Sequence, residues 1–333
     1  MSDYNPQGDG AEIVARIKAA REKIANELKK GIIGQETIIE ELIIAIFTRG
    51  HCLMTGVPGL GKTMLVKSIA EIFSLSFKRI QFTPDLMPAD ISGTEIVEED
   101  AATGKRTFHF NKGPIFANLV LADEINRTPP KTQAALLEAM EERQVTAAGR
   151  TFPMDQPFFV LATQNPIELE GTYPLPEAQL DRFIFNVVLT CLPTEQEEEM
   201  VMRTTNPSKP VFDKIFTGDD IIQIQQLVRE VPVPENVVKY AVRLVSATRG
   251  LEGSPAYVKE YIKWGAGSRA SQALVLAGKA RALLHGRYNV SIEDIKALAP
   301  PVLRHRVLTN FHADAEGITI EEIIKRLLSD IPE

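Results

Sequence analysis

The feature that most constrains the fold of this chain is a glycine-rich octapeptide placed between an apolar run and a helical stretch. Residues 56–63 read Gly-Val-Pro-Gly-Leu-Gly-Lys-Thr; the apolar run 52–54 precedes them, and the helical stretch continues from 62 to 73. In this order the glycines let backbone N–H groups converge on phosphates, and the helix N-terminus adds positive potential. The pattern predicts a phosphate-binding loop that joins a strand to a helix in an α/β fold.

Two side chains of this loop have expected roles toward ATP and Mg²⁺. Lys62 is expected to reach the β- and γ-phosphates, and the Thr63 hydroxyl is expected to coordinate Mg²⁺. The remaining nucleotide contacts are predicted for the rest of the loop and the residue after it, namely Gly56, Val57, Pro58, Gly59, Leu60, Gly61 and Met64. ATP and Mg²⁺ are therefore the predicted ligands.

An acidic pair supplies the second signal. Asp123 and Glu124 follow directly after the apolar run 119–122. Beside a phosphate-binding loop, Asp123 would hold Mg²⁺ through water, and Glu124 would orient and deprotonate the attacking water. Two acids can also simply cap the next helix. The loop upstream favours the metal and water roles.

Three more polar residues are candidates for the site. Asn165 follows the apolar run 158–163. If this run forms a strand between the strand before the loop and the strand before Asp123, Asn165 points at the γ-phosphate. Otherwise Asn165 is a turn residue before a proline. Arg182 ends a short helical segment, and Arg269 begins a helix in the second half of the chain. A bound anion would explain an arginine at a helix start, which the helix dipole disfavours, although either arginine could serve an ordinary surface ion pair.

The order of apolar and helical segments predicts the fold class. Five strand-like segments alternate with helical ones near 62–73, 130–143 and 177–182; the strand segments are 50–55, 77–82, 118–123, 157–163 and 183–189. This alternation predicts a parallel five-stranded sheet between helices. Polar turns near 92–110 and 144–152 predict two inserted hairpins. Ahead of the sheet we expect a disordered tail at 1–10, an amphipathic helix at 11–29 and a buried helix at 36–48.

The chain after residue 193 has helical patterns with little strand signal. The helical segments are 194–204, 218–229, 235–249, 268–286 and 291–298. A chain of 333 residues fits two domains better than one. We therefore expect an α/β nucleotide-binding domain over 11–192 and a small all-helical lid domain over 193–333.

Charge and composition narrow the function classes. A net charge of −7 and a pI near 5.5 make nucleic acid an unlikely partner, and the best basic cluster, 304–306, is too small to change that expectation. No apolar run approaches the ~18 residues of a membrane span, and the polar start lacks a signal-peptide pattern. With only Cys52 and Cys191, we expect a reduced, cytoplasmic protein.

These motifs together resemble the AAA+ superfamily and, within it, the MoxR family, from about Gly34 to Leu328. Six segments carry the resemblance: Ile-Gly-Gln at 33–35, the loop at 56–63, Leu-Ala-Asp-Glu-Ile-Asn-Arg at 121–127, the helix at 130–142, Ala-Thr-Gln-Asn-Pro at 162–166 and Leu-Asp-Arg-Phe at 180–183. Combined with two hairpins, they resemble the branch that contains MoxR, magnesium chelatase and MCM proteins.

The resemblance implies roles that spacing alone does not assign. Gly34 and Gln35 would lie near the adenine, and Asn165 would be sensor 1. Arg182 looks like the arginine finger, which acts on ATP held by the neighbouring subunit, and Arg269 looks like sensor 2. A homo-oligomeric ring, as a hexamer, is therefore implied. The hairpin residues Lys105, Arg106 and Arg150 would be candidate contacts to a client protein.

The resemblance also implies a function. MoxR relatives are regarded as chaperone-like ATPases that mature or activate enzyme complexes, often with a protein bearing a von Willebrand factor A domain, and the same client class is expected here. Other classes remain as alternatives. A magnesium-chelatase motor would show porphyrin-dependent turnover, and a DNA translocase would need a basic channel. A small-molecule kinase would need a lid between strands, and a scaffold that only binds ATP would lack the acid or the finger.

Overall fold

A parallel five-stranded sheet forms the centre of the first half of the chain. The computed structural model describes residues 6–57, 59–99, 106–147, 149–165, 171–205 and 210–333. The strand order is β2-β5-β8-β1-β9, with bounds β1 Cys52–Thr55, β2 Phe77–Gln81, β5 Leu119–Asp123, β8 Phe159–Gln164 and β9 Phe185–Val188. All neighbouring strands are parallel, which confirms the predicted sheet. The three central strands are apolar and buried, as expected where helices cover both faces.

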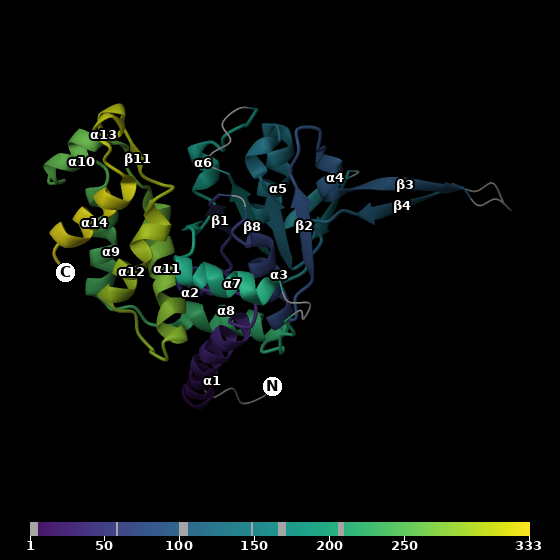
Figure 1. Ribbon diagram of the computed structural model, residues 1–333, viewed down its shortest axis with the longest axis horizontal. Coiled ribbons are helices and arrows are strands. Elements are labelled where there is room, and N and C mark those ends of the chain that lie inside the picture. Colours follow the sequence, from purple (N-terminus) through teal and green to yellow (C-terminus); the bar gives the residue numbers. More distant parts are fainter. Residues whose placement is uncertain (1–5, 58, 100–105, 148, 166–170, 206–209) are drawn as a thin grey trace.

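Alternate residues of these strands build two cores, one on each face of the sheet. Leu119 and Leu121 of β5 pack with α2 (Glu36–Phe47) and α3 (Lys62–Ile72). Val120, from the same strand, packs with α5 (Pro130–Glu142) on the other face. Figure 1 shows the sheet between these helices. The two-residue period of a strand therefore divides the apolar side chains between two helical layers.

Antiparallel pairs form at both places where the sequence predicts hairpins. After the short helix α4 (Pro88–Ser92), β3 (Gly93–Glu99) pairs with β4 (Arg106–Lys112), and this ribbon extends away from the body in Figure 1. β6 (Gln144–Ala147) pairs with β7 (Arg150–Pro153). Arg106 forms an ion pair with Glu99, whereas Lys105 lies outside the described residues.

The N-terminal helix begins earlier than the sequence predicts. Helix α1 spans Pro6–Leu28, so residues 6–10, expected in a disordered tail, are helical; residues 1–5 lie outside the described part. Proline is favoured in the first helical turn, because its fixed φ suits a helix and its missing N–H would have no partner there. Further along, Ile17, Ile24 and Leu28 are buried, which confirms an amphipathic helix.

The regular structure described after residue 193 is helical except for one small sheet. Its helices are α7 Thr194–Thr204, α8 Gly218–Glu230, α9 Glu235–Ala247, α10 Ala256–Tyr261, α11 Ser268–Leu284, α12 Ile292–Leu303, α13 Phe311–Glu316 and α14 Ile320–Asp330. Strands β10 (Ile262–Trp264) and β11 (Leu308–Thr309) pair antiparallel, so the expectation of an all-helical lid was wrong in this detail. Strands of two or three residues are too short to produce an alternating pattern.

Helix α8 packs against the helices of the sheet rather than standing apart from them. The Gln225 side chain donates a hydrogen bond to the Ile46 carbonyl at 2.7 Å, and Arg49 donates to the Gln225 amide oxygen at 2.9 Å. One continuous apolar core also runs from α2 and α3 to α9, α11 and α12. The two halves of the chain therefore share a core.

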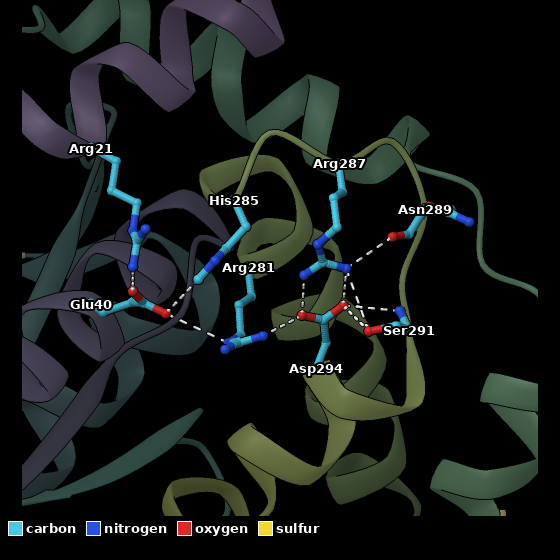
Figure 2. Close-up of polar contacts among 8 residues, drawn as sticks. All are labelled: Arg21, Glu40, Arg281, His285, Arg287, Asn289, Ser291 and Asp294. Atoms are coloured by element: carbon cyan, nitrogen blue, oxygen red, sulfur yellow. Dashed lines mark hydrogen bonds and ion pairs between the residues drawn. The ribbon is translucent and has the colours of Figure 1, made fainter.

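A buried aspartate links the lid helices and connects them to α2. Asp294 of α12 is fully buried and accepts hydrogen bonds from Arg287 at 2.6 and 2.8 Å, from Arg281 at 2.5 Å and from the Ser291 backbone at 2.9 Å (Figure 2). Burial raises the pKa of Asp294, but these hydrogen bonds outweigh it and set the pKa at about 2. Arg281 also lies 3.5 Å from Glu40 of α2, so the network spans three helices.

The basic cluster at 304–306 faces inward. The Arg306 side chain is 4% exposed; it donates to the Asp181 carboxylate at 2.7 Å and to the Phe183 carbonyl at 2.6 Å. Burial holds the pKa of His305 well below its ordinary value, and His305 contacts the same carbonyl at 3.0 Å. Arg306 and His305 therefore fix α12 to the end of the sheet domain and do not form a surface patch.

Candidate active site

The loop of residues 56–63 connects the carboxyl end of β1 to the N-terminus of α3, as predicted. Gly59 and Gly61 have φ of 87° and 73°, a left-handed conformation that strongly favours glycine. A Cβ on Gly56 would lie 2.9 Å from the Leu189 carbonyl oxygen, so glycine is needed there for close approach. Pro58 lies outside the described residues. The backbone of the loop therefore explains its glycines.

Lys62 reaches back over this loop. Its Nζ donates to the Gly56 carbonyl, inside the turn where a phosphate would sit. Burial lowers the pKa of Lys62, while the nearby carboxylates of Asp123 and Glu124 act in the opposite direction. Within the described ranges the half-buried Lys62 ammonium has only this neutral carbonyl as a hydrogen-bond partner. It therefore fits an anionic phosphate well, because charge-assisted hydrogen bonds are stronger than neutral ones.

An apolar cavity of about 180 Å³ opens beside the loop. The Gln35 side chain donates to the Leu60 carbonyl at 3.3 Å, and its buried amide oxygen has no hydrogen-bond partner among the described residues. A buried acceptor of this kind calls for a donor, and the exocyclic amine of adenine would supply one. The cavity wall fits a flat ring; it includes Ile33, Leu60, Met64, Leu192 and Met200.

Gly34 directly precedes Gln35, which lines this cavity. Its φ of 68° is left-handed, and a Cβ there would lie 1.9 Å from the Gln196 amide oxygen of α7. The chain therefore passes close to α7 and places Gln35 in the cavity wall. The geometry is compatible with the predicted adenine contact of Gly34 and Gln35, which stays a prediction.

The acidic pair stands at the end of β5, next to β8. Glu124 has φ 58° and ψ 49°, a left-handed conformation that is costly for a residue other than glycine and is common at functional sites. The Thr163 hydroxyl donates to Asp123 at 2.6 Å and accepts from the Glu124 N–H at 2.8 Å. Thr163 therefore orients both acidic residues, a role that the sequence analysis missed.

The position of β8 meets the condition set for Asn165. β8 lies between β1 and β5, so the loop, the acidic pair and Asn165 share one edge of the sheet. Asn165 is 7% exposed and follows Thr163 by two residues. Its role toward the γ-phosphate stays a prediction.

Two residues of β2 contact the acidic pair and were also missed. Arg79 donates to one carboxylate oxygen of Asp123 from Nε at 3.0 Å and from Nη2 at 2.6 Å. Arg79 also donates to the Gln81 amide oxygen at 2.6 Å, and Gln81 donates to Glu124 at 2.8 Å. The available signal was that both are polar, stand two apart on one strand and therefore share a face.

The two candidate arginines converge on a single glutamate. Arg182 forms an ion pair with Glu141 of α5 at 2.7 Å and donates to the Leu137 carbonyl at 3.1 Å. Arg269, at the start of α11, lies 3.6 Å from Glu141 and 3.6 Å from Asp181. The structure thus brings these arginines together from distant segments. The contacts are the ion pairs that the sequence left open as an alternative, and action on ATP stays a prediction.

Comparison with known proteins decides the family. A model of the ATPase family associated with various cellular activities (AAA) matches residues 51–185, and a model of the AAA lid domain matches residues 255–327. The chain is 42% identical to the chaperone MoxR1 of Mycobacterium tuberculosis over 323 residues, which cover 97% of this chain and 84% of that protein. The chain belongs to the MoxR family of AAA ATPases.

Other relatives agree with this assignment. The protein MoxR of Methylorubrum extorquens is 29% identical over 353 residues and matches over 99% of its length. The crystal structure of a candidate ATPase from Cytophaga hutchinsonii, 42% identical, superposes with a TM-score of 0.89 over 98% of this chain and 99% of that one. As a MoxR-family AAA protein, the chain binds nucleotide and is an ATP hydrolase. None of the helices within the described ranges combines the length and the apolar character that a membrane span requires.

The residues of the site also suit Mg²⁺. Thr63 and Asp123 offer hydroxyl and carboxylate oxygens, the ligand type that Mg²⁺ prefers, and few protein ligands are needed where phosphates and water complete the shell. The Asp123 side chain is 14% exposed, so part of it is accessible to solvent. The described donors therefore fit a Mg²⁺ ion that is bound together with the nucleotide.

Proposed function

We propose that this MoxR-family protein hydrolyses ATP between the subunits of a cytoplasmic homo-oligomeric ring, a hexamer, to remodel or activate a client protein. The observation that supports a site between subunits is that Arg182 and Arg269 both form ion pairs with Glu141. The loop, Lys62 and the acidic pair gather at the carboxyl edge of the sheet, while the ion-pair partners of both arginines are Glu141 and Asp181. Among the described residues neither arginine forms an ion pair with the acidic pair beside the loop, and both pair with Glu141, which suits a nucleotide held by a second copy.

The residues of one copy would prepare the attack. Lys62 would bind the β- and γ-phosphates, and Thr63 and Asp123 would hold Mg²⁺, which would supply charge neutralisation at the phosphates. Glu124 orients a water and accepts its proton, and Asn165 fixes the position of that water. The Glu124 side chain must first exchange its hydrogen bond from Gln81 for one from water, because that bond occupies a carboxylate oxygen.

The neighbouring copy would complete the site. Arg182 and Arg269 stabilise negative charge that spreads over the phosphate oxygens, a contribution worth on the order of 10³ to 10⁵ in rate for an arginine finger. To reach a nucleotide, both arginines leave Glu141, which is half-exposed and can pair with water instead. Movement of the lid against the sheet after hydrolysis would be the mechanical output.

A mixing experiment tests the shared site. Glu124→Gln and Arg182→Ala are each expected to hydrolyse ATP very slowly. In a random 1:1 mixture, about a quarter of the interfaces join an intact Glu124 to an intact Arg182, so turnover should recover measurably. Arg243→Ala, an exposed arginine on α9, serves as a matched control and should retain wild-type turnover. A mixture no more active than its two components contradicts hydrolysis between subunits.

We also propose that the client is a protein with a von Willebrand factor A domain. The name of the relative, chaperone MoxR1, supports a role toward client proteins. The choice of a von Willebrand factor A domain rests on what the resemblance to the MoxR family implies. Purified Glu124→Gln protein with ATP should retain such a domain protein on affinity beads, whereas Lys62→Ala should not. The client proposal fails if the purified protein neither binds such a partner nor shows ATP hydrolysis stimulated by it.

A further inference from the structure

Arg79 occupies the carboxylate that the proposed function assigns to Mg²⁺. One oxygen of Asp123 accepts two N–H groups from Arg79, at 3.0 and 2.6 Å, and the other accepts the Thr163 hydroxyl at 2.6 Å. A carboxylate oxygen has about two lone-pair sites. The oxygen facing Arg79 is therefore saturated, and a metal-bound water could reach it only after a guanidinium bond breaks.

The position of Arg79 allows it to leave. β2 is an edge strand of the sheet, and the Arg79 side chain is 48% exposed. A half-exposed ion pair of this kind contributes little to stability, because water can replace either partner. Arg79 also donates to the Gln81 amide oxygen at 2.6 Å. The Arg79 guanidinium therefore keeps an acceptor beside the site after a metal ion has displaced it from Asp123.

We propose that Arg79 is a positioning residue that holds the Asp123 carboxylate in place of the metal and yields it when Mg²⁺ arrives with nucleotide. The proposal rests on the role assigned to Asp123 in the proposed function. In the exchange a dication replaces a monocation beside Asp123 and Glu124. Before that exchange Arg79 neutralises Asp123 and, through Gln81, helps to orient Glu124. The metal competes with Arg79 for the Asp123 oxygen that the guanidinium occupies.

Binding of Mn²⁺ in the presence of ADP, followed by electron paramagnetic resonance, tests the exchange. Mn²⁺ stands for Mg²⁺ because both favour oxygen ligands. In Arg79→Gln the Mn²⁺ concentration for half-saturation should fall about fivefold, since the competitor is lost. The affinity for ADP without metal should not change. Lys78→Gln removes the same charge from the opposite face of β2 and should shift half-saturation less than about twofold.

A second variant keeps the test valid if Arg79→Gln does not fold. Arg79→Lys retains the positive charge but cannot donate two hydrogen bonds from a planar guanidinium. The Mn²⁺ concentration for half-saturation should therefore fall about twofold. Unchanged or raised half-saturation in both variants overturns the proposal, and so does an equal shift in Lys78→Gln. If the wild-type protein binds no Mn²⁺ with ADP, the assigned metal site itself is wrong, an outcome separate from the failure of Arg79 to compete.

Discussion

Two aspartates in this protein are held by arginines and a hydroxyl group, yet they differ in burial. Asp294 in the lid is fully buried and accepts hydrogen bonds from two arginines and from Ser291 (Figure 2). Asp123 in the site is 14% exposed and is held by Arg79 alone among the described arginines, together with Thr163. The groups that bind the two aspartates are of the same types, but Asp294 is buried and Asp123 is partly exposed to solvent.

The difference teaches how one kind of contact serves either structure or function. Around Asp294 no partner can leave without exposing a buried charge, so the network fixes α11 to α12. Around Asp123 the arginine stands on an edge strand with water beside it, so it can be exchanged at small cost. Asp123 therefore differs from Asp294 in that its arginine partner can be replaced, and not in the types of residue that bind it.

Removing the buried charge should have the largest effect on stability. Asp294→Asn leaves the guanidinium groups of Arg281 and Arg287 facing a neutral side chain, so the free energy of unfolding should fall by about 3–5 kcal/mol. Urea unfolding at neutral pH measures it. Asp123→Asn is the matched control and should lose less than about 1 kcal/mol. Equal losses for the two variants would contradict the comparison.

The same substitution at the site should instead affect turnover. Asp123→Asn removes the charged carboxylate that would hold Mg²⁺ through water in the proposed site, so steady-state ATP hydrolysis should fall about hundredfold or more. Affinity for ADP measured without Mg²⁺ should stay at the wild-type value, because the loop and cavity are intact. If hydrolysis by Asp123→Asn matched the wild type at saturating Mg²⁺, Asp123 would not be the residue that holds the metal ion.

A third carboxylate, that of Glu41, extends the comparison, because its burial makes the free energy of unfolding depend on pH. Burial raises the pKa of Glu41 on α2 to about 7, despite the nearby charge of Arg304; among the described residues Glu41 has no hydrogen-bonded arginine like those of Asp294. The folded-state pKa exceeds the unfolded value of 4.5, so the free energy of unfolding falls as pH rises through about 7.

Glu41→Gln places a neutral side chain at this position at every pH, so it separates the effect of the protonated carboxyl group from that of the ionised one. Thermal or urea unfolding should show wild-type stability near pH 5 and a gain of about 1–2 kcal/mol near pH 8. Asp294→Asn should show no such gain at pH 8. A Glu41→Gln protein that was equally or less stable than the wild type at pH 8 would show that this carboxylate is not held protonated by burial.

The elements predicted best from the sequence are those set by local pattern. The loop at 56–63 follows from glycine spacing, and the three central strands follow from apolar runs buried on both faces. β10 and β11 were missed because they are short and held together by contacts distant in sequence. The start of α1 was misplaced because a polar, proline-bearing segment suggests a tail, although proline also suits a helix start.

The site was predictable only where its residues are adjacent in the chain. Lys62, Asp123 and Glu124 belong to local motifs, whereas Arg79 meets Asp123 only because β2 pairs with β5. Glu141 carried no signal of its own, since its contact with the two arginines depends on how α5 and the lid pack. Strand order and helix packing therefore supplied what sequence reasoning lacked.

Glu124→Gln tests the central claim most directly, since the claim is that one acid beside the phosphate loop activates water. Single-turnover hydrolysis of bound ATP should slow by about 10² to 10⁴, with ATP affinity unchanged. Glu142→Gln, an exposed acid at the end of α5, should match the wild type. Wild-type hydrolysis by Glu124→Gln would contradict the assignment of Glu124.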